Sequence, residues 1–362
     1  MKIYSSLAIL VIFGLLQKVQ AFPAYNIEDS DGEESRTVWP IPQRNGSIIW
    51  MTEEEAWLEA EQTEQGAMNF GTQNERKVRF FLYTQQNPRE SIELFINDTE
   101  TLKKSTFNSK YPTRFMIHGW ATDHNHEDLF AVKEALLLNG EKRQFNYISV
   151  DWSVYSHTMN YISAKNKTSK AGEQVAQFID WLHDSANLSF TNLAVYGHSL
   201  GAHVSGFTGK NVKLGRVHTI VGLDPAMPLF RIKYPEKRLS ATDAVYVETI
   251  QTNGGLLGFY NPIGQSAFYP NGGKYQPGCG NDLKGSCSHG RSTAYFAEAL
   301  RFGNRNGLTG IGCKDFESVK NEKCRQFSAR RRLGDPNNAL LPNGLFYVKT
   351  NADSPYGKSI RL

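Results

Sequence analysis

A serine within a G-x-S-x-G motif, at residues 197–201, is the residue best placed to do chemistry in this chain. The apolar run at 193–196 and the helical pattern at 202–207 predict a strand, a tight turn and a helix around it. Ser199 would then lie at the apex of the turn, and the two glycines leave room where strand and helix crowd together. The pattern predicts a nucleophile; a glycine-lined turn with an incidental serine is the alternative.

A serine nucleophile needs a general base and an acid that orients the base. In this architecture the acid and then the histidine follow the serine, and of nine histidines only His289 lies beyond Asp224. Asp224 ends an apolar strand, where sheet proteins place functional residues, and Pro225 stiffens the next turn. We therefore predict a triad with Asp224 as the acid and His289 in a loop just before a helix, and we interpret His118 and His203 as structural. Other acids between serine and histidine fit less well: Glu236, Asp243, Glu248 and Asp282.

Such a triad predicts acyl transfer. Ser199 attacks an acyl carbonyl, while His289 takes the serine proton and returns it to the leaving alkoxide. The oxyanion needs two backbone N–H groups. We expect one from Leu200, directly after the nucleophile, and the other from the loop after a predicted strand, at Gly119 and Trp120.

The N-terminus and the cysteines indicate a secreted, extracellular protein. Residues 1–21 resemble a signal peptide, with an apolar stretch at 7–16 and a small-residue cleavage site; a membrane anchor is the alternative. No later segment approaches about 20 apolar residues, so we expect no integral membrane segment. Four cysteines predict two disulfides rather than zinc, and among three pairings we favour sequence neighbours. The cysteines are Cys279, Cys287, Cys313 and Cys324, and sequons predict glycosylation at Asn45, Asn97, Asn166 and Asn187.

The rest of the 362 residues divides into two parts. Residues 22–66 hold 11 acidic and two basic residues and are interpreted as an acidic N-terminal extension with one polar helix at 53–65. Residues 67–362 are predicted to form one domain. Its strands are expected at 78–84, 91–96, 114–117, 147–150, 193–196, 217–223, 244–250 and 344–349, and its helices at 129–138, 171–183, 202–207 and 292–302. This alternation predicts an α/β fold with a mainly parallel sheet and helices on both faces.

Several motifs, in order from about residue 78 to the end, resemble those of the pancreatic lipase family. They are GHSLGAH at 197–203, GLDPA at 222–226, FYPNGG at 268–273, CSH at 287–289, HGW at 118–120 and VDW at 150–152. The resemblance implies an α/β hydrolase that acts on lipid carboxylic esters. It places the triad on Ser199, Asp224 and His289, and the oxyanion pair on Trp120 and Leu200. It also implies a lipid substrate at a lipid–water interface and no nucleic-acid partner.

Three departures refine the expected activity. The chain ends without the C-terminal β-sandwich domain of vertebrate digestive members, so a cofactor protein that docks there is not implied. The family's lid lies between two cysteines before the catalytic histidine, and here only seven residues separate Cys279 from Cys287. This short loop resembles phospholipase A1 members and secreted insect relatives, and it can bury little apolar area. We therefore expect weak interfacial activation and favour phospholipase A1 slightly over triacylglycerol lipase activity.

The third departure lies in a loop where some family members bind calcium. Arg238 and Asp243 match that loop, but Ser240 replaces a carboxylate of digestive members. We expect no metal or other cofactor, with structural calcium left open. A non-catalytic lipid-binding or yolk-storage relative on the same fold is the main alternative function, and a serine peptidase or small-ester hydrolase is a further one.

Overall fold

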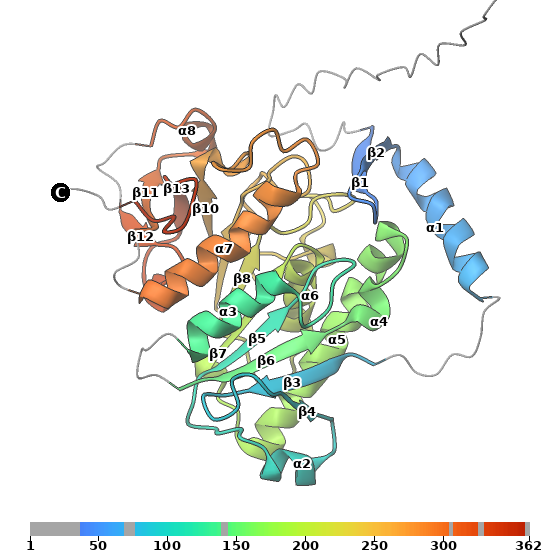
Figure 1. Ribbon diagram of the computed structural model, residues 1–362, viewed down its shortest axis with the longest axis vertical. Helices are drawn as coiled ribbons and strands as arrows, with labels where there is room; N and C mark the ends of the chain where they lie inside the picture. The colour runs from blue at the N-terminus through green and yellow to red at the C-terminus, as the bar shows by residue number, and fades with distance from the viewer. Residues whose placement is uncertain (1–36, 69–76, 139–143, 304–306, 325–328, 359–362) are drawn as a thin grey trace, which may run out of the picture.

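The computed structural model describes residues 37–68, 77–138, 144–303, 307–324 and 329–358. The signal peptide predicted at 1–21 lies outside these ranges. An 11-stranded sheet runs through the molecule (Figure 1). Across the sheet its strands are β12 (Arg330–Arg332), β11 (Thr309–Cys313), β13 (Gly344–Val348), β10 (Ser266–Pro270), β9 (Tyr246–Ile250), β8 (Thr219–Leu223), β7 (Leu193–His198), β5 (Thr113–Ile117), β6 (Asn146–Asp151), β3 (Arg79–Tyr83) and β4 (Ile92–Leu94).

Neighbouring strands from β6 to β13 pair in parallel, whereas the strands at both edges pair antiparallel. Helices cover both faces. On one face lie α3 (Glu127–Leu137) and α7 (Ser286–Phe302), and on the other lie α5 (Tyr161–Ala186) and α6 (Leu200–Asn211). The arrangement confirms the predicted α/β-hydrolase fold.

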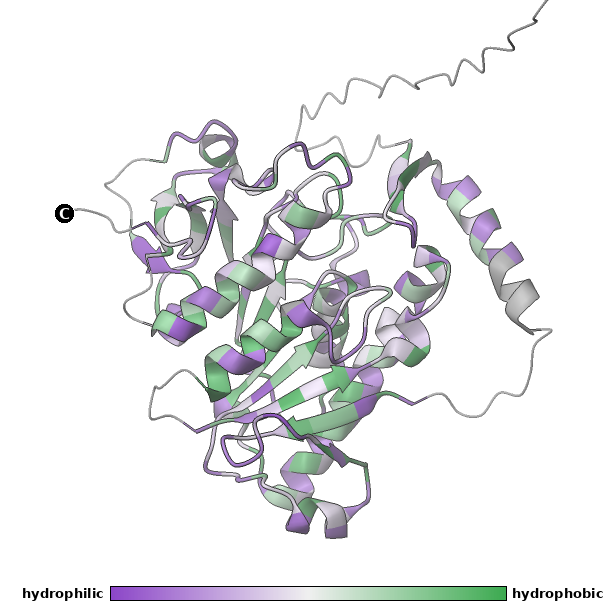
Figure 2. Cartoon of the chain, in the orientation of Figure 1, coloured by the Kyte–Doolittle hydropathy of each residue, from purple (hydrophilic) through white to green (hydrophobic). Residues whose placement is uncertain are grey.

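Both faces of the sheet are buried, which explains why its strands are nearly continuous apolar runs. Consecutive residues of a strand belong to the hydrophobic cores on opposite faces of the sheet. In β5, Phe115 packs in the core with α5 and α6, and Met116 packs in the core with α3 and α7. Figure 2 shows hydrophobic residues gathered on the central strands and the inward helix surfaces. No helix in the described ranges is long and apolar enough to cross a membrane.

Several features of the sheet region were not predicted, among them strands β10, β11 and β12. Strand β10 was missed because it is short and ends in Pro270, although it lies fully buried between β9 and β13. Helix α5 begins ten residues earlier than the predicted start at 171, at Tyr161. Its N-terminus is capped by Asn160, whose side-chain oxygen accepts hydrogen bonds from the backbone N–H groups of Ile162 and Ser163. The first turn is buried, but the polar residues Lys165, Asn166 and Lys167 follow it and interrupt the helical apolar signal.

The N-terminal segment packs onto the domain. A hairpin of β1 (Trp39–Pro42) and β2 (Ile48–Met51) precedes α1 (Glu53–Met68), which matches the predicted helix at 53–65. Trp39 is fully buried, and Ile41 and Ala56 belong with it to the same core as α5. Glu53, at the start of α1, also forms an ion pair with Arg231. Residues on the N-terminal side of the predicted boundary at residue 66 therefore pack against the domain, and the boundary itself stays a prediction. The remaining helices are α2 (Thr99–Lys104), α4 (Ser153–Ser156) and α8 (Phe316–Lys320).

Candidate active site

The candidate nucleophile lies on a strained turn between β7 and α6. Ser199 has φ 57° and ψ −124°, a conformation that residues other than glycine rarely adopt. A Cβ on Gly197 would lie 2.2 Å from the carbonyl oxygen of Gly201, and one on Gly201 would lie 2.3 Å from that of Ile117. Only glycine fits at either position, so the motif's spacing follows from the close approach of strand and helix.

The predicted acid and base form a hydrogen-bonded pair. Asp224 directly follows β8, is fully buried, and has the unusual φ of 41°. Its Oδ2 lies 2.6 Å from Nδ1 of His289. Its Oδ1 accepts hydrogen bonds from the backbone N–H groups of Thr252 at 2.7 Å and Asn253 at 3.0 Å. With the carboxylate held in this way, Nδ1 of His289 donates and Nε2 is left to act as a base.

The predicted loop position of His289 is wrong, because the residue lies in the first turn of α7. Gly285 takes a left-handed conformation with φ 73°, and the helix begins at the next residue. The carboxylate of Asp282 accepts a 2.7 Å hydrogen bond from the N–H of Ser288, which stabilises this helix start. A disulfide between Cys279 and Cys287 closes the preceding loop.

Ser199 and His289 line one cavity of about 250 Å³. No hydrogen bond joins their side chains in the described part of the chain; such bonds often tighten only when substrate is bound. Both predicted oxyanion positions flank the serine. Leu200 is the first residue of α6, and Trp120 lines the cavity next to Gly119, where a Cβ would lie 3.1 Å from Cβ of Ser199.

The sequence did not identify His198 as part of the site. Its ring centroid lies 4.5 Å from that of His289, and its Nε2 lies 3.3 Å from the backbone oxygen of His289, so this nitrogen is the donor. Burial lowers the pKa of His198 well below its ordinary value, so the ring stays neutral beside the candidate base. Its position just before the nucleophile was the available signal.

Other cavity residues come from distant parts of the chain. The hydroxyl of Tyr161 donates to the carbonyl oxygen of Pro228 at 3.2 Å, and its ring meets that of Trp120 edge-on at 5.7 Å. Leu257 and Pro42 also line the cavity. No sequence motif marks these residues, because only the fold brings them together.

His118 and His203 have structural roles, as predicted. His118 accepts a hydrogen bond from the N–H of Trp152 at 3.1 Å. His203 donates to the carbonyl oxygen of Ala226 at 2.7 Å and accepts from the N–H of Leu239 at 3.1 Å. Burial lowers the pKa of His203 to about 3, so this ring is neutral and fixes the loops around it.

In the loop that resembles a calcium site, the cation beside the carboxylate is the side chain of a lysine. Lys210 forms an ion pair with Asp243, whose side chain is 1% exposed. Ser240 donates to the same carboxylate through its N–H at 2.8 Å and its hydroxyl at 2.7 Å. Burial raises the pKa of Asp243, and hydrogen bonding and charge from Lys210 oppose that shift. An ammonium group therefore balances the charge of this carboxylate, and the absence of a bound metal stays a prediction.

The cysteines pair as favoured from the sequence, Cys279 with Cys287 and Cys313 with Cys324. All four sequon asparagines are exposed, and their glycosylation stays a prediction.

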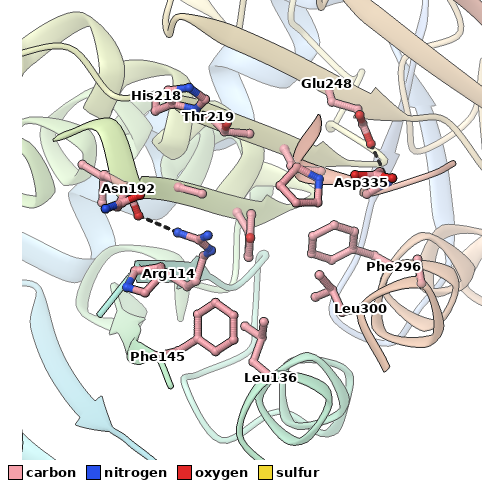
Figure 3. A pocket seen from close by; sticks show the side chains of 18 of the residues that line it. Arg114, Leu136, Phe145, Asn192, His218, Thr219, Glu248, Phe296, Leu300 and Asp335 are labelled. Atoms are coloured by element: carbon pink, nitrogen blue, oxygen red, sulfur yellow. Dashed lines mark hydrogen bonds between the residues drawn. The ribbon is translucent and has the colours of Figure 1, made fainter. Parts of the chain in front are cut away.

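A second cavity, of about 390 Å³, lies at the amino ends of the parallel strands between α3 and α7 (Figure 3). Arg114 donates to the carbonyl oxygen of Asn192 there. Burial raises the pKa of Glu248 to about 7, against hydrogen bonds from Asn338, Gly334 and Tyr246. This cavity is larger than the one at Ser199, and in it the hydroxyl of Thr219 lies 2.9 Å from Nδ1 of His218. Within the described residues no carboxylate hydrogen-bonds to His218, so this pair lacks the third member of a triad. The chemistry therefore points to the smaller cavity.

Comparisons with known proteins give the family of this chain. A family model described as Lipase matches residues 44–356. Phospholipase A1 of Polybia paulista is 36% identical over 299 residues, which cover 78% of this chain and 90% of that protein. Hepatic triacylglycerol lipase of Rattus norvegicus is 34% identical over 333 residues, which cover 81% of this chain and 65% of that protein. An α/β serine hydrolase of Xanthomonas campestris, described as lacking a lid, matches 56% of this chain and 84% of its own at 11% identity and a TM-score of 0.32.

Proposed function

Because the chain belongs to the lipase family of carboxylic ester hydrolases, we propose that it cleaves lipid esters through an acyl-enzyme formed on Ser199. The observation that carries this proposal is the 2.6 Å contact between Asp224 and His289, at a cavity that also exposes Ser199. A buried carboxylate that orients an imidazole beside a strained serine is the arrangement that acyl transfer requires.

The reaction proceeds in two halves. Ser199 Oγ attacks the acyl carbonyl while Nε2 of His289 takes its proton, and Asp224 stabilises the imidazolium. Backbone N–H groups of Leu200 and Trp120 donate to the oxyanion. His289 then protonates the departing alkoxide. In the second half it activates a water molecule that releases the fatty acid and restores the serine.

Phospholipids are the substrates that we favour, with hydrolysis at the sn-1 ester. The short loop between Cys279 and Cys287 supports this preference, since Leu283, its single large apolar residue, is 62% exposed and does not line the cavity. The similarity to a phospholipase A1 over 90% of that relative's length also supports it. Two disulfides are consistent with secretion, which we propose as well.

The test compares the wild-type protein with Ser199→Ala. Substrates are phosphatidylcholine with distinguishable sn-1 and sn-2 chains, and a triolein emulsion. We expect release of the sn-1 chain by the wild type alone. Activity confined to triolein would instead establish a triacylglycerol lipase. If folded wild-type protein releases no fatty acid from either substrate in a Ser199-dependent way, a non-catalytic lipid-binding or storage protein becomes the better interpretation.

A further inference from the structure

The β1–β2 hairpin reaches the cavity that holds Ser199. Pro42, the last residue of β1, lines this cavity, whereas its strand neighbours Trp39 and Ile41 are buried in the core. The family match begins at residue 44, so the strand that carries Pro42 precedes the region that the family model matches. A wall of the site is therefore supplied by a segment that the sequence placed outside the domain.

The hairpin is held on both sides of the cavity. At its base, the guanidinium of Arg231 lies 5.4 Å from the centroid of the Trp39 ring. At its turn, Arg44 forms a 2.8 Å hydrogen bond with Nε2 of His157. A Cβ placed on Gly46 would lie 3.8 Å from Cδ and Nζ of Lys284, which belongs to the disulfide loop before α7. The hairpin thus has neighbours both in the segment around Arg231 and in the disulfide loop.

Besides Pro42, the cavity has other uncharged and mostly apolar lining residues. Trp120, Tyr161, Pro228 and Leu257 line the cavity together with Pro42. The first three are joined by the ring contact and hydrogen bond described above, and the hydroxyl of Tyr161 is already used by a backbone carbonyl. None of these side chains is charged. An acyl chain can bury its apolar surface here at about 25 cal/mol per Å². The buried Nε1 of Trp120 has no hydrogen-bond partner among the described residues.

The geometry points to Pro42 as a determinant of acyl-chain selectivity, held in place by the anchored hairpin. This inference rests on the proposed function and adds to it the element that shapes the acyl side. The short disulfide loop contributes Ser286 to the cavity but directs Leu283 toward solvent. A fixed hairpin therefore provides the wall, and no lid movement is needed to form it.

The experiment measures kcat and KM for p-nitrophenyl esters of acetate, butyrate, octanoate and dodecanoate, all presented in mixed micelles with a fixed excess of a nonionic detergent. In Pro42→Trp, we expect kcat/KM for dodecanoate to fall at least tenfold more than kcat/KM for acetate, mainly through KM. Ile49→Trp is the matched control, because Ile49 lies on the other strand of the hairpin, is 43% exposed and does not line the cavity. This control should keep the wild-type chain-length profile.

Pro42→Ala covers the case in which the larger residue prevents folding. Removing the proline ring atoms enlarges the cavity. This variant should therefore hydrolyse α-branched acyl esters at least threefold faster, relative to unbranched esters, than the wild type does. An unchanged chain-length profile in the folded Pro42 variants would overturn the inference. So would equal losses on acetate and dodecanoate, or the same change in Ile49→Trp. Failure of the proposed function is distinct, because acetate hydrolysis would then survive Ser199→Ala or be absent from the wild type.

Discussion

Replacing Asp224 with asparagine tests the proposed catalytic arrangement most directly. The Oδ1 position receives two backbone N–H groups, from Thr252 and Asn253. The carbonyl oxygen of the asparagine must therefore take this position, because an amide NH₂ there would face two donors. The NH₂ group is then placed against Nδ1 of His289. That nitrogen becomes an acceptor, so the ring proton moves to Nε2 and the base can no longer take the serine proton.

In serine hydrolases of this mechanism, holding the histidine with its proton on the wrong nitrogen lowers kcat by about 10⁴-fold. This loss corresponds to about 5 kcal/mol of transition-state stabilisation. We expect a loss of this size for Asp224→Asn on p-nitrophenyl butyrate, with KM changed little. Thermal unfolding should remain cooperative. Asp315→Asn is a suitable control, because Asp315 caps the distant helix α8 and asparagine caps almost as well. If Asp224→Asn retains more than about 1% of wild-type kcat, the orienting role assigned to Asp224 is refuted.

Three further predictions concern stability and lipid surfaces. Burial raises the pKa of Glu248 to about 7 from 4.5, so stability is full below pH 4.5 and falls as the pH rises toward 7, by about 3 kcal/mol at most. Glu248→Gln should flatten this slope in unfolding temperature between pH 5 and 8. Lys210→Met should cost about 3–5 kcal/mol by leaving Asp243 buried and unpaired, whereas a chelator should not change the unfolding temperature of the wild type; a chelator-induced drop would show that calcium binds after all. Finally, hydrolysis of a short-chain phosphatidylcholine should rise smoothly through its aggregation threshold, and a sharp jump would contradict the interpretation of the short disulfide loop.

Much of the fold was predictable because its strands are buried on both faces. Apolar runs such as 193–196 and 217–223 have no other stable location, and they became β7 and β8. The candidate triad was predictable for a different reason. The order of serine, acid and histidine left His289 as the only eligible base, and the structure places it 2.6 Å from Asp224.

Features that depend on tertiary contacts were not predictable. The start of α7 depends on Gly285 and on the side chain of Asp282, which no apolar period reveals. The sequence of β1 looks like part of an acidic extension, because the partners that bury Trp39 lie far along the chain. Pro42 could be assigned to the cavity only after the hairpin was placed.

The packing of Trp39 has a consequence for how the protein is made. This residue is among the first of the domain to leave the ribosome, but Arg231, which lies against its ring, is synthesised nearly two hundred residues later. Domains generally fold as units during synthesis, and contacts between distant residues form slowly. The N-terminal hairpin must therefore wait for the sheet, and Trp39 stays available to chaperones until then. Ser199, Arg231 and His289 leave the ribosome in that order, so the candidate nucleophile is synthesised before the cavity around it can form.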